Sequence, residues 1–214
     1  MNTPKLALRI YRGAIFCGQP GCPKQIPTPP PAAPVPSVAP GPAGPGSVPP
    51  SSAPAQAGIG DGTFKVGTDV QAGTYRTRTG APGCYWERLS GFSGATSDII
   101  ANDNTDAPAV VTINKSDAGF SSDSCAPWVT DLSALTSSRT TFGDGTYIVK
   151  TDLVPGTYKS AGGTGCYWER LSGFGGTDAE ILANDNVDGP TIVTIKATDA
   201  GFSSHSCGTW TRQP

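Results

Sequence analysis

Six cysteines are the residues of this chain best suited to covalent chemistry. An even number favours disulfide pairing, which small domains use when their cores are small. The spacing between the third and fourth cysteines is repeated between the fifth and sixth, as expected if each pair closes one repeated unit. A bridge over about 40 residues stabilises such a unit by about 4 kcal/mol through chain entropy. We therefore predict the bridges Cys84–Cys125 and Cys166–Cys207, and by elimination Cys17–Cys22.

Metal binding is the competing interpretation of the cysteines. Cys17 and Cys22 form a Cys-x4-Cys pair, and His205 is the only histidine of the chain. Its counterpart in the first copy is Asp123, so the two copies do not share it. Zinc also needs four ligands at tight spacing. We expect neither a metal nor any other cofactor.

A Tyr-Trp-Glu-Arg motif follows the first cysteine of each pair. On a β-strand, Trp86 shares one face with Cys84 and Arg88, whereas Tyr85 and Glu87 share the other. One interpretation therefore packs Trp86 against the disulfide in the core.

The other interpretation concerns the opposite face of the same strand. Tyr85 and Glu87, with Tyr167 and Glu169 in the second copy, would form an exposed stripe for ligand recognition. Carbohydrate is the ligand class that we associate with such a stripe, and a cell-envelope glycan is the expected partner.

Catalytic constellations are not expected. The unshared His205 prevents a Ser-His-Asp or Cys-His arrangement in both copies. The chain has no GxSxG, P-loop or HExxH motif. Residues 184–189 resemble the start of a calcium loop, but Ile195 occupies the position where an EF-hand requires a bidentate glutamate. A turn between two strands fits this segment better, and we expect no enzyme.

The elements that position these residues come from a duplication. Residues 60–131 and 143–214 both contain GTY, GCYWERLSGF, ANDN and DAGFSS in the same order. Short strand signals alternate with turns rich in glycine, asparagine and aspartate. We predict an all-β fold of two tandem, disulfide-stapled modules, each a small β-sandwich or barrel. The strands expected in the first copy are 63–66, 73–77, 84–89, 98–101 and 109–113, with a turn at 102–104.

Two segments of different composition precede the modules. Residues 27–58 are rich in proline, alanine and glycine, and predict an extended linker. Residues 1–26 hold too little apolar surface to fold alone, but enough to add a strand to the sheet edge of a partner. We expect them to anchor the protein through Leu8, Ile10, Tyr11, Ile15 and Phe16.

Charge and hydropathy exclude several classes of protein. Charged residues make up 15% of the chain and the net charge is −2, so we expect no nucleic-acid partner. The apolar runs are too short to span a bilayer. Arg9 and Arg12 interrupt the only stretch that could serve as a signal peptide. The chain thus combines disulfide chemistry with the lack of a recognisable export signal.

The repeated run GTY…GCYWERLSGF…ANDN…DAGF resembles a β-module of secreted and lipid-anchored actinobacterial proteins. It also resembles modules in minor tail or decoration-type structural proteins of phages that infect these bacteria. The resemblance covers both copies and leaves out the first 58 residues. It implies a cell-surface or virion setting, and it transfers no activity and no site residue.

Two hypotheses of function follow. In the first, the protein is a non-enzymatic virion accessory protein at the virion surface, either a capsid decoration or a minor tail protein. Residues 1–26 would bind a capsid or tail protein, and the modules would face outward to bind the host surface. Lysis would deliver such a protein to the oxidising exterior without a signal peptide. The alternative is a secreted or cell-surface, adhesion-like protein of an actinobacterium.

Overall fold

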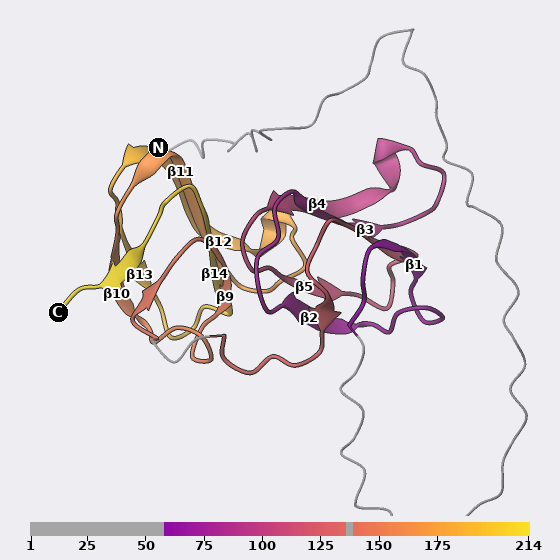
Figure 1. The fold of residues 1–214 in the computed structure, drawn as a ribbon, viewed down its shortest axis with the longest axis horizontal. Coiled ribbons are helices and arrows are strands. Elements are labelled where there is room, and N and C mark those ends of the chain that lie inside the picture. Colours follow the sequence, from indigo (N-terminus) through magenta and orange to yellow (C-terminus); the bar gives the residue numbers. More distant parts are fainter. Residues whose placement is uncertain (1–57, 136–138) are drawn as a thin grey trace, which may run out of the picture. The chain divides into compact units, whose positions relative to one another are not determined.

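The computed structural model describes residues 58–135 and 139–214, which form two tandem modules (Figure 1). The anchoring segment 1–26, the Cys17–Cys22 pair and the linker up to residue 57 lie outside the described residues. Helical structure in the described ranges consists of two 3-10 turns, η1 Thr96–Asp98 and η2 Asp178–Glu180. None of the helices described there is long and apolar enough to cross a membrane.

The first module consists of two antiparallel sheets, as expected for a β-sandwich. The turn-rich sequence keeps its strands short, and alternate residues of each strand point into the core. The larger sheet has the order β1-β6-β3-β4, and the smaller one has the order β5-β2-β7. The strands are β1 Gly62–Lys65, β2 Gly73–Thr77, β3 Cys84–Leu89, β4 Ile99–Thr105, β5 Val110–Ile113, β6 Gly119–Asp123 and β7 Trp128–Val129.

The second module repeats this arrangement with two four-stranded sheets. The sheet β12-β11-β14-β9, with the longer strands, corresponds to the larger sheet of the first module, and the sheet β13-β10-β15-β8 corresponds to the smaller one. The extra strand β8 pairs Phe142 with Trp210, where the first copy has only a bridge from Ile59 to Trp128. The strands are β8 Thr141–Phe142, β9 Gly145–Ile148, β10 Gly156–Ser160, β11 Gly163–Leu171, β12 Ile181–Gly189, β13 Ile192–Ile195, β14 Gly201–His205 and β15 Trp210–Arg212.

The all-β, duplicated and disulfide-stapled architecture predicted from the sequence is confirmed, but two details differ. The predicted turn at 102–104 lies inside β4, and the segment 184–189 likewise lies inside β12. Their polar side chains alternate between the two faces of a strand that pairs with the Tyr-Trp-Glu-Arg strand. The central strands β6 and β14 were not expected, because two of the five residues in each are serines, which weaken the apolar alternation.

A disulfide and an aromatic cluster fill the core of each sandwich. Cys84 bonds to Cys125 and Cys166 bonds to Cys207, which joins the start of the Tyr-Trp-Glu-Arg strand to the segment after its neighbour. Trp86 lies in the same buried cluster as Cys84, so the core interpretation of the tryptophan is correct. In both copies one phenylalanine meets a tryptophan edge to face, Phe120 with Trp128 and Phe202 with Trp210, an arrangement that aromatic rings favour in a core.

A buried ion pair closes one end of each core. Arg88 donates through Nε and Nη2 to both oxygens of Asp117, each over 2.7 Å. Arg170 and Asp199 repeat this bidentate geometry over the same distances. Burial raises the pKa of Asp199, but hydrogen bonds from Arg170 and from the Lys196 N–H outweigh burial, so this pKa lies below its ordinary value. The negative charge of Asp199 therefore stabilises the folded state.

This pair yields a pH-dependent prediction. Asp199→Asn should lower the free energy of unfolding by roughly 3 kcal/mol at pH 7, because it leaves the Arg170 charge without its partner. A depressed folded-state pKa contributes stability that is complete above the unfolded pKa of about 3.9 and is lost as the pH falls through the folded value. The deficit of the variant should therefore shrink below about pH 4. Urea unfolding, followed by tryptophan fluorescence, measures the free energy of unfolding of the wild type and the variant at pH 7 and below about pH 4. An equal deficit of the variant under the two conditions would contradict the prediction.

Candidate functional site

A polar cluster, here called the Tyr85 cluster, lies on the outer face of the larger sheet of the first module. Tyr85 and Glu87 point outward from β3, and Asn102 is their neighbour on β4. The Tyr85 hydroxyl donates to Glu87 Oε2 over 2.8 Å and accepts from Asn102 Nδ2 over 3.1 Å. All three side chains are half-buried, so they are held in place and still reachable from solvent.

The second module builds the same cluster, here called the Tyr167 cluster. Tyr167 donates to Glu169 over 2.8 Å and accepts from Asn184 over 3.1 Å. Its surroundings differ, because Glu169 is only 9% exposed whereas its counterpart Glu87 is half-buried. The carboxylate of the expected stripe is therefore buried in the second copy, whereas Tyr167 and Asn184 are half-buried like Tyr85 and Asn102.

The first module contacts the second at the edge strand β9 and at the neighbouring strand β14. The Thr146 N–H, on the edge strand β9, donates to the Pro108 carbonyl over 2.8 Å. A Cβ on Gly145 would lie 2.9 Å from the same carbonyl oxygen, so the two chains approach closely here. On the neighbouring strand β14, His205 Nε2 lies 3.9 Å from Asp103 Oδ2.

A loop of the second module also closes the open side of the first sandwich, between the edge strands β4 and β5. The Phe174 carbonyl accepts from the Thr112 N–H over 2.8 Å, and the Gly175 carbonyl accepts from Arg88 Nη1 over 2.6 Å. The next residue is Gly176, whose φ is 74°. A Cβ there would lie 2.8 Å from Trp86 Cη2, so only glycine fits against the core tryptophan.

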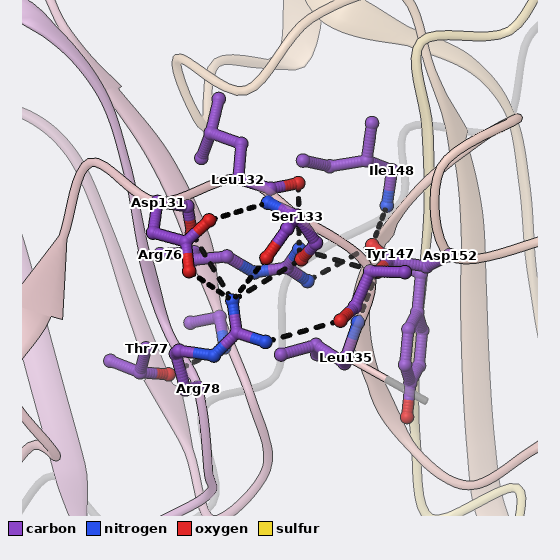
Figure 2. Close-up of polar contacts among 12 residues, drawn as sticks. Arg76, Thr77, Arg78, Asp131, Leu132, Ser133, Leu135, Tyr147, Ile148 and Asp152 are labelled. Carbon is purple, nitrogen blue, oxygen red and sulfur yellow. Dashed lines mark hydrogen bonds and ion pairs between the residues drawn. The ribbon is translucent and has the colours of Figure 1, made fainter. Parts of the chain in front are cut away.

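An ion pair joins the modules at the centre of this contact. Figure 2 shows Arg76 of β2 beside Asp152, with Nη1–Oδ1 at 3.2 Å and Nη2–Oδ2 at 2.9 Å. Asp152 also accepts from the N–H groups of Ile148 and Leu135, and Arg76 also donates to the Ser133 carbonyl. The two charged side chains are 0% and 1% exposed. These hydrogen bonds offset part of the cost of taking both charges out of water, although Arg76 Nε is buried without a partner.

A second ion pair lies at the rim of the same contact. Arg78 Nη1 lies 3.1 Å from Asp131 Oδ2, and the two side chains are 38% and 60% exposed (Figure 2). Hydrogen bonds from the Ser133 N–H and hydroxyl, and then the charge of Arg78, lower the pKa of Asp131 below its ordinary value. Exposed pairs of this kind contribute little to stability.

The sequence argument missed the contact between the modules, although a signal for it was present. The aligned copies differ in the size or charge of the side chain at several positions of the contact. If the corresponding surfaces of both copies faced only solvent, no shared cause would make the copies differ at these positions. The pairs, first copy before second, are Arg76 and Lys159, Ser93 and Gly175, Val110 and Ile192, and Asp123 and His205.

Metal-binding chemistry is not evident in this part of the chain. Among residues 58–135 and 139–214, no three histidine, cysteine, aspartate or glutamate side chains come close enough to hold an ion. The segment 184–189, which resembles a calcium loop in sequence, is a strand paired with β11. What the described residues hold instead is a polar cluster whose side chains are fixed to one another by hydrogen bonds.

The two ion pairs of the junction give a matched test. Asp152→Asn should lower the free energy of unfolding by about 3 to 5 kcal/mol, because it leaves the buried Arg76 charge partly unpaired. Asp131→Asn makes the same chemical change at the exposed rim and should alter the stability little. Urea unfolding at pH 7 measures both variants. Equal effects of the two substitutions would show that the Arg76–Asp152 pair does not hold the modules together.

Comparison with known proteins agrees with this duplicated architecture. A family model described as an Rv1352-like extracellular domain matches residues 56–129 and again residues 139–211. Uncharacterized proteins of Mycobacterium tuberculosis (Rv1352) and Mycobacterium bovis (Mb1387) are each 31% identical over 84 residues, which cover 33% of this chain and 68% of theirs. No solved structure matches. The chain therefore belongs to the Rv1352-like extracellular domain family and carries two copies of its domain in tandem.

Proposed function

We propose that this protein is a non-enzymatic, adhesion-like protein, secreted or held at the cell surface, that binds a cell-envelope glycan. The outer face of the larger sheet of the first module is the binding surface. The observation that carries the proposal is the Tyr85 cluster, an aromatic ring, a carboxylate and an amide fixed to one another by hydrogen bonds and half-exposed.

The chemistry of the cluster suits a sugar. A carboxylate accepts hydrogen bonds and an amide both donates and accepts them, which matches the hydroxyl groups of a carbohydrate. A tyrosine offers a rigid, amphipathic contact area at a low cost in conformational entropy. The bonds from Tyr85 to Glu87 and from Asn102 to Tyr85 fix these groups before a ligand arrives, which lowers the entropic cost of binding.

The location outside the cell rests on the family and on the disulfides. The family is described as an extracellular domain, and disulfides persist in oxidising compartments. The relatives named above are bacterial proteins, which favours the secreted or cell-surface alternative over the virion accessory protein. In this proposal residues 1–26 attach the protein to the envelope rather than to a capsid or tail protein.

Glycan binding can be tested with a matched pair of substitutions. Purified mycobacterial cell-wall sacculi with their attached polysaccharide serve as the ligand in a sedimentation assay. Glu87→Gln and Tyr85→Phe each remove one group of the Tyr85 cluster and should weaken binding at least about tenfold, or about 1.4 kcal/mol.

The control is Glu169→Gln, the same chemical change in the Tyr167 cluster. It should weaken binding to sacculi much less than Glu87→Gln, because the Glu169 side chain is only 9% exposed. The proposal fails if the wild-type protein does not bind, or if Glu169→Gln weakens binding as much as Glu87→Gln does.

A further inference from the structure

We infer that a second copy of this chain docks head to tail, through the same contact that joins the two modules within one chain. Within one chain, the second module contacts the first through one of its surfaces. The aligned residues of the first module form a matching surface, here called the donor face. It comprises the edge strand β1, Asp69 and the loop 92–94. The first module receives this contact through a different surface. The aligned residues of the second module form the acceptor face, which comprises Lys159, Arg170, Pro190, Ile192 and Thr194.

Burial is the first argument. Ile192 is 62% exposed on the acceptor face, whereas its counterpart Val110 is 4% exposed because the second module covers it. On the donor face Asp69 is exposed, whereas its counterpart Asp152 is 1% exposed. Each surface is therefore buried in one copy and open in the other.

Charge is the second argument. Arg76 and Asp152 correspond to Lys159 and Asp69, so the sign of each charge is retained on the open faces. Asp69 accepts from the Lys65 N–H over 2.9 Å, as Asp152 accepts from the Ile148 N–H over 2.7 Å. The donor carboxylate is thus already held as it is in the buried pair.

The closing loop is the third argument. Gly94 has a φ of 75°, nearly the value of Gly176, and no atom lies within 4 Å of a Cβ placed on it. Phe92 beside it is 51% exposed. The loop 92–94 thus has its glycine in the same left-handed conformation as the loop that closes the first sandwich, and there is open space at this glycine.

The groups that would receive this loop are present on the acceptor face. Arg170 donates to Asp199 through Nε and Nη2, as Arg88 donates to Asp117. Arg170 Nη1 therefore points in the direction in which Arg88 Nη1 donates to a loop carbonyl. Thr194 pairs with Thr157 in the register that Thr112 keeps with Thr74. Its N–H therefore points away from β10, as the Thr112 N–H points away from β2 toward Phe174.

Three differences make this contact weaker than the one within the chain. Lys159 replaces Arg76, and an ammonium cannot form the two parallel hydrogen bonds that the guanidinium forms with the carboxylate. Ser93 replaces Gly175, where a Cβ would lie 2.9 Å from the arginine Nη1, so the guanidinium must shift. Asp123 replaces His205 and would face Asp185 of the other molecule, a like-charge pair in place of His205 and Asp103. The contact within the chain also benefits from an effective concentration of roughly millimolar.

The contact is heterologous, so each docked molecule again offers one open donor face and one open acceptor face. The inference goes beyond the proposed function and does not depend on it, since the acceptor face lies on the other module.

Sedimentation velocity of the full chain, from low micromolar to roughly millimolar concentration, tests the inference. The wild-type protein should form dimers and longer species as the concentration rises. Ser93→Gly combined with Asp123→His makes the donor face resemble the second module and should tighten association at least about tenfold. Lys159→Asp should abolish it, and so should Asp69→Lys.

The double variant Asp69→Lys with Lys159→Asp exchanges the two charges and should restore association, which also controls for the charge changes. Lys159 is exposed, so its variant should fold normally and keep its affinity for sacculi. Loss of association without loss of glycan binding separates this inference from the proposed function. The inference is overturned if the Ser93→Gly/Asp123→His protein stays monomeric, or if Lys159→Asp associates like the wild type.

Discussion

The two modules meet through unlike surfaces, and the differences in burial between the copies follow from this constraint. The first module contributes its smaller sheet and the open side of its sandwich, whereas the second contributes the face of its larger sheet and one loop. Because both modules have the same fold, such a contact leaves one surface of each kind uncovered. In the two Tyr-Glu-Asn clusters the difference falls on the carboxylate: Glu169 is buried and Glu87 is half-buried, whereas the tyrosine and the asparagine are half-buried in both copies.

The Arg76–Asp152 pair sets the register of this contact. Two charges withdrawn from water are costly, and the pair is tolerable only because further hydrogen bonds reach both side chains. The planar guanidinium can contact the carboxylate and the Ser133 carbonyl together, which a lysine ammonium does less well. Burial, followed by the negative charges of Asp144 and Asp152, raises the pKa of the adjacent Tyr147 to about 12. Its ring therefore stays neutral beside the pair.

The sequence predicts what repetition and alternation encode. The duplicated cysteines give the bridges Cys84–Cys125 and Cys166–Cys207, and alternation places Trp86 in the core. It does not predict β6, whose serines break the apolar pattern. It also misses the pairing of Arg88 with Asp117, because one lies on a strand and the other in a turn 29 residues later. The sequence pattern of one copy cannot predict a contact between the two copies. Only the positions at which the copies differ indicate that contact.

Edge strands show what the contact achieves physically. Unpaired edges invite pairing with other chains, and natural sheets protect them with charges, irregularities or a covering segment. The edge strands β5 and β9 are covered, because the Thr112 and Thr146 N–H groups donate across the junction. The open edge β1 ends in the exposed Lys65, a charge that discourages pairing. The open edge β13 has the exposed Ile192 instead. A contact like the one that covers Val110 in the first copy is the protection that this edge lacks within a single chain.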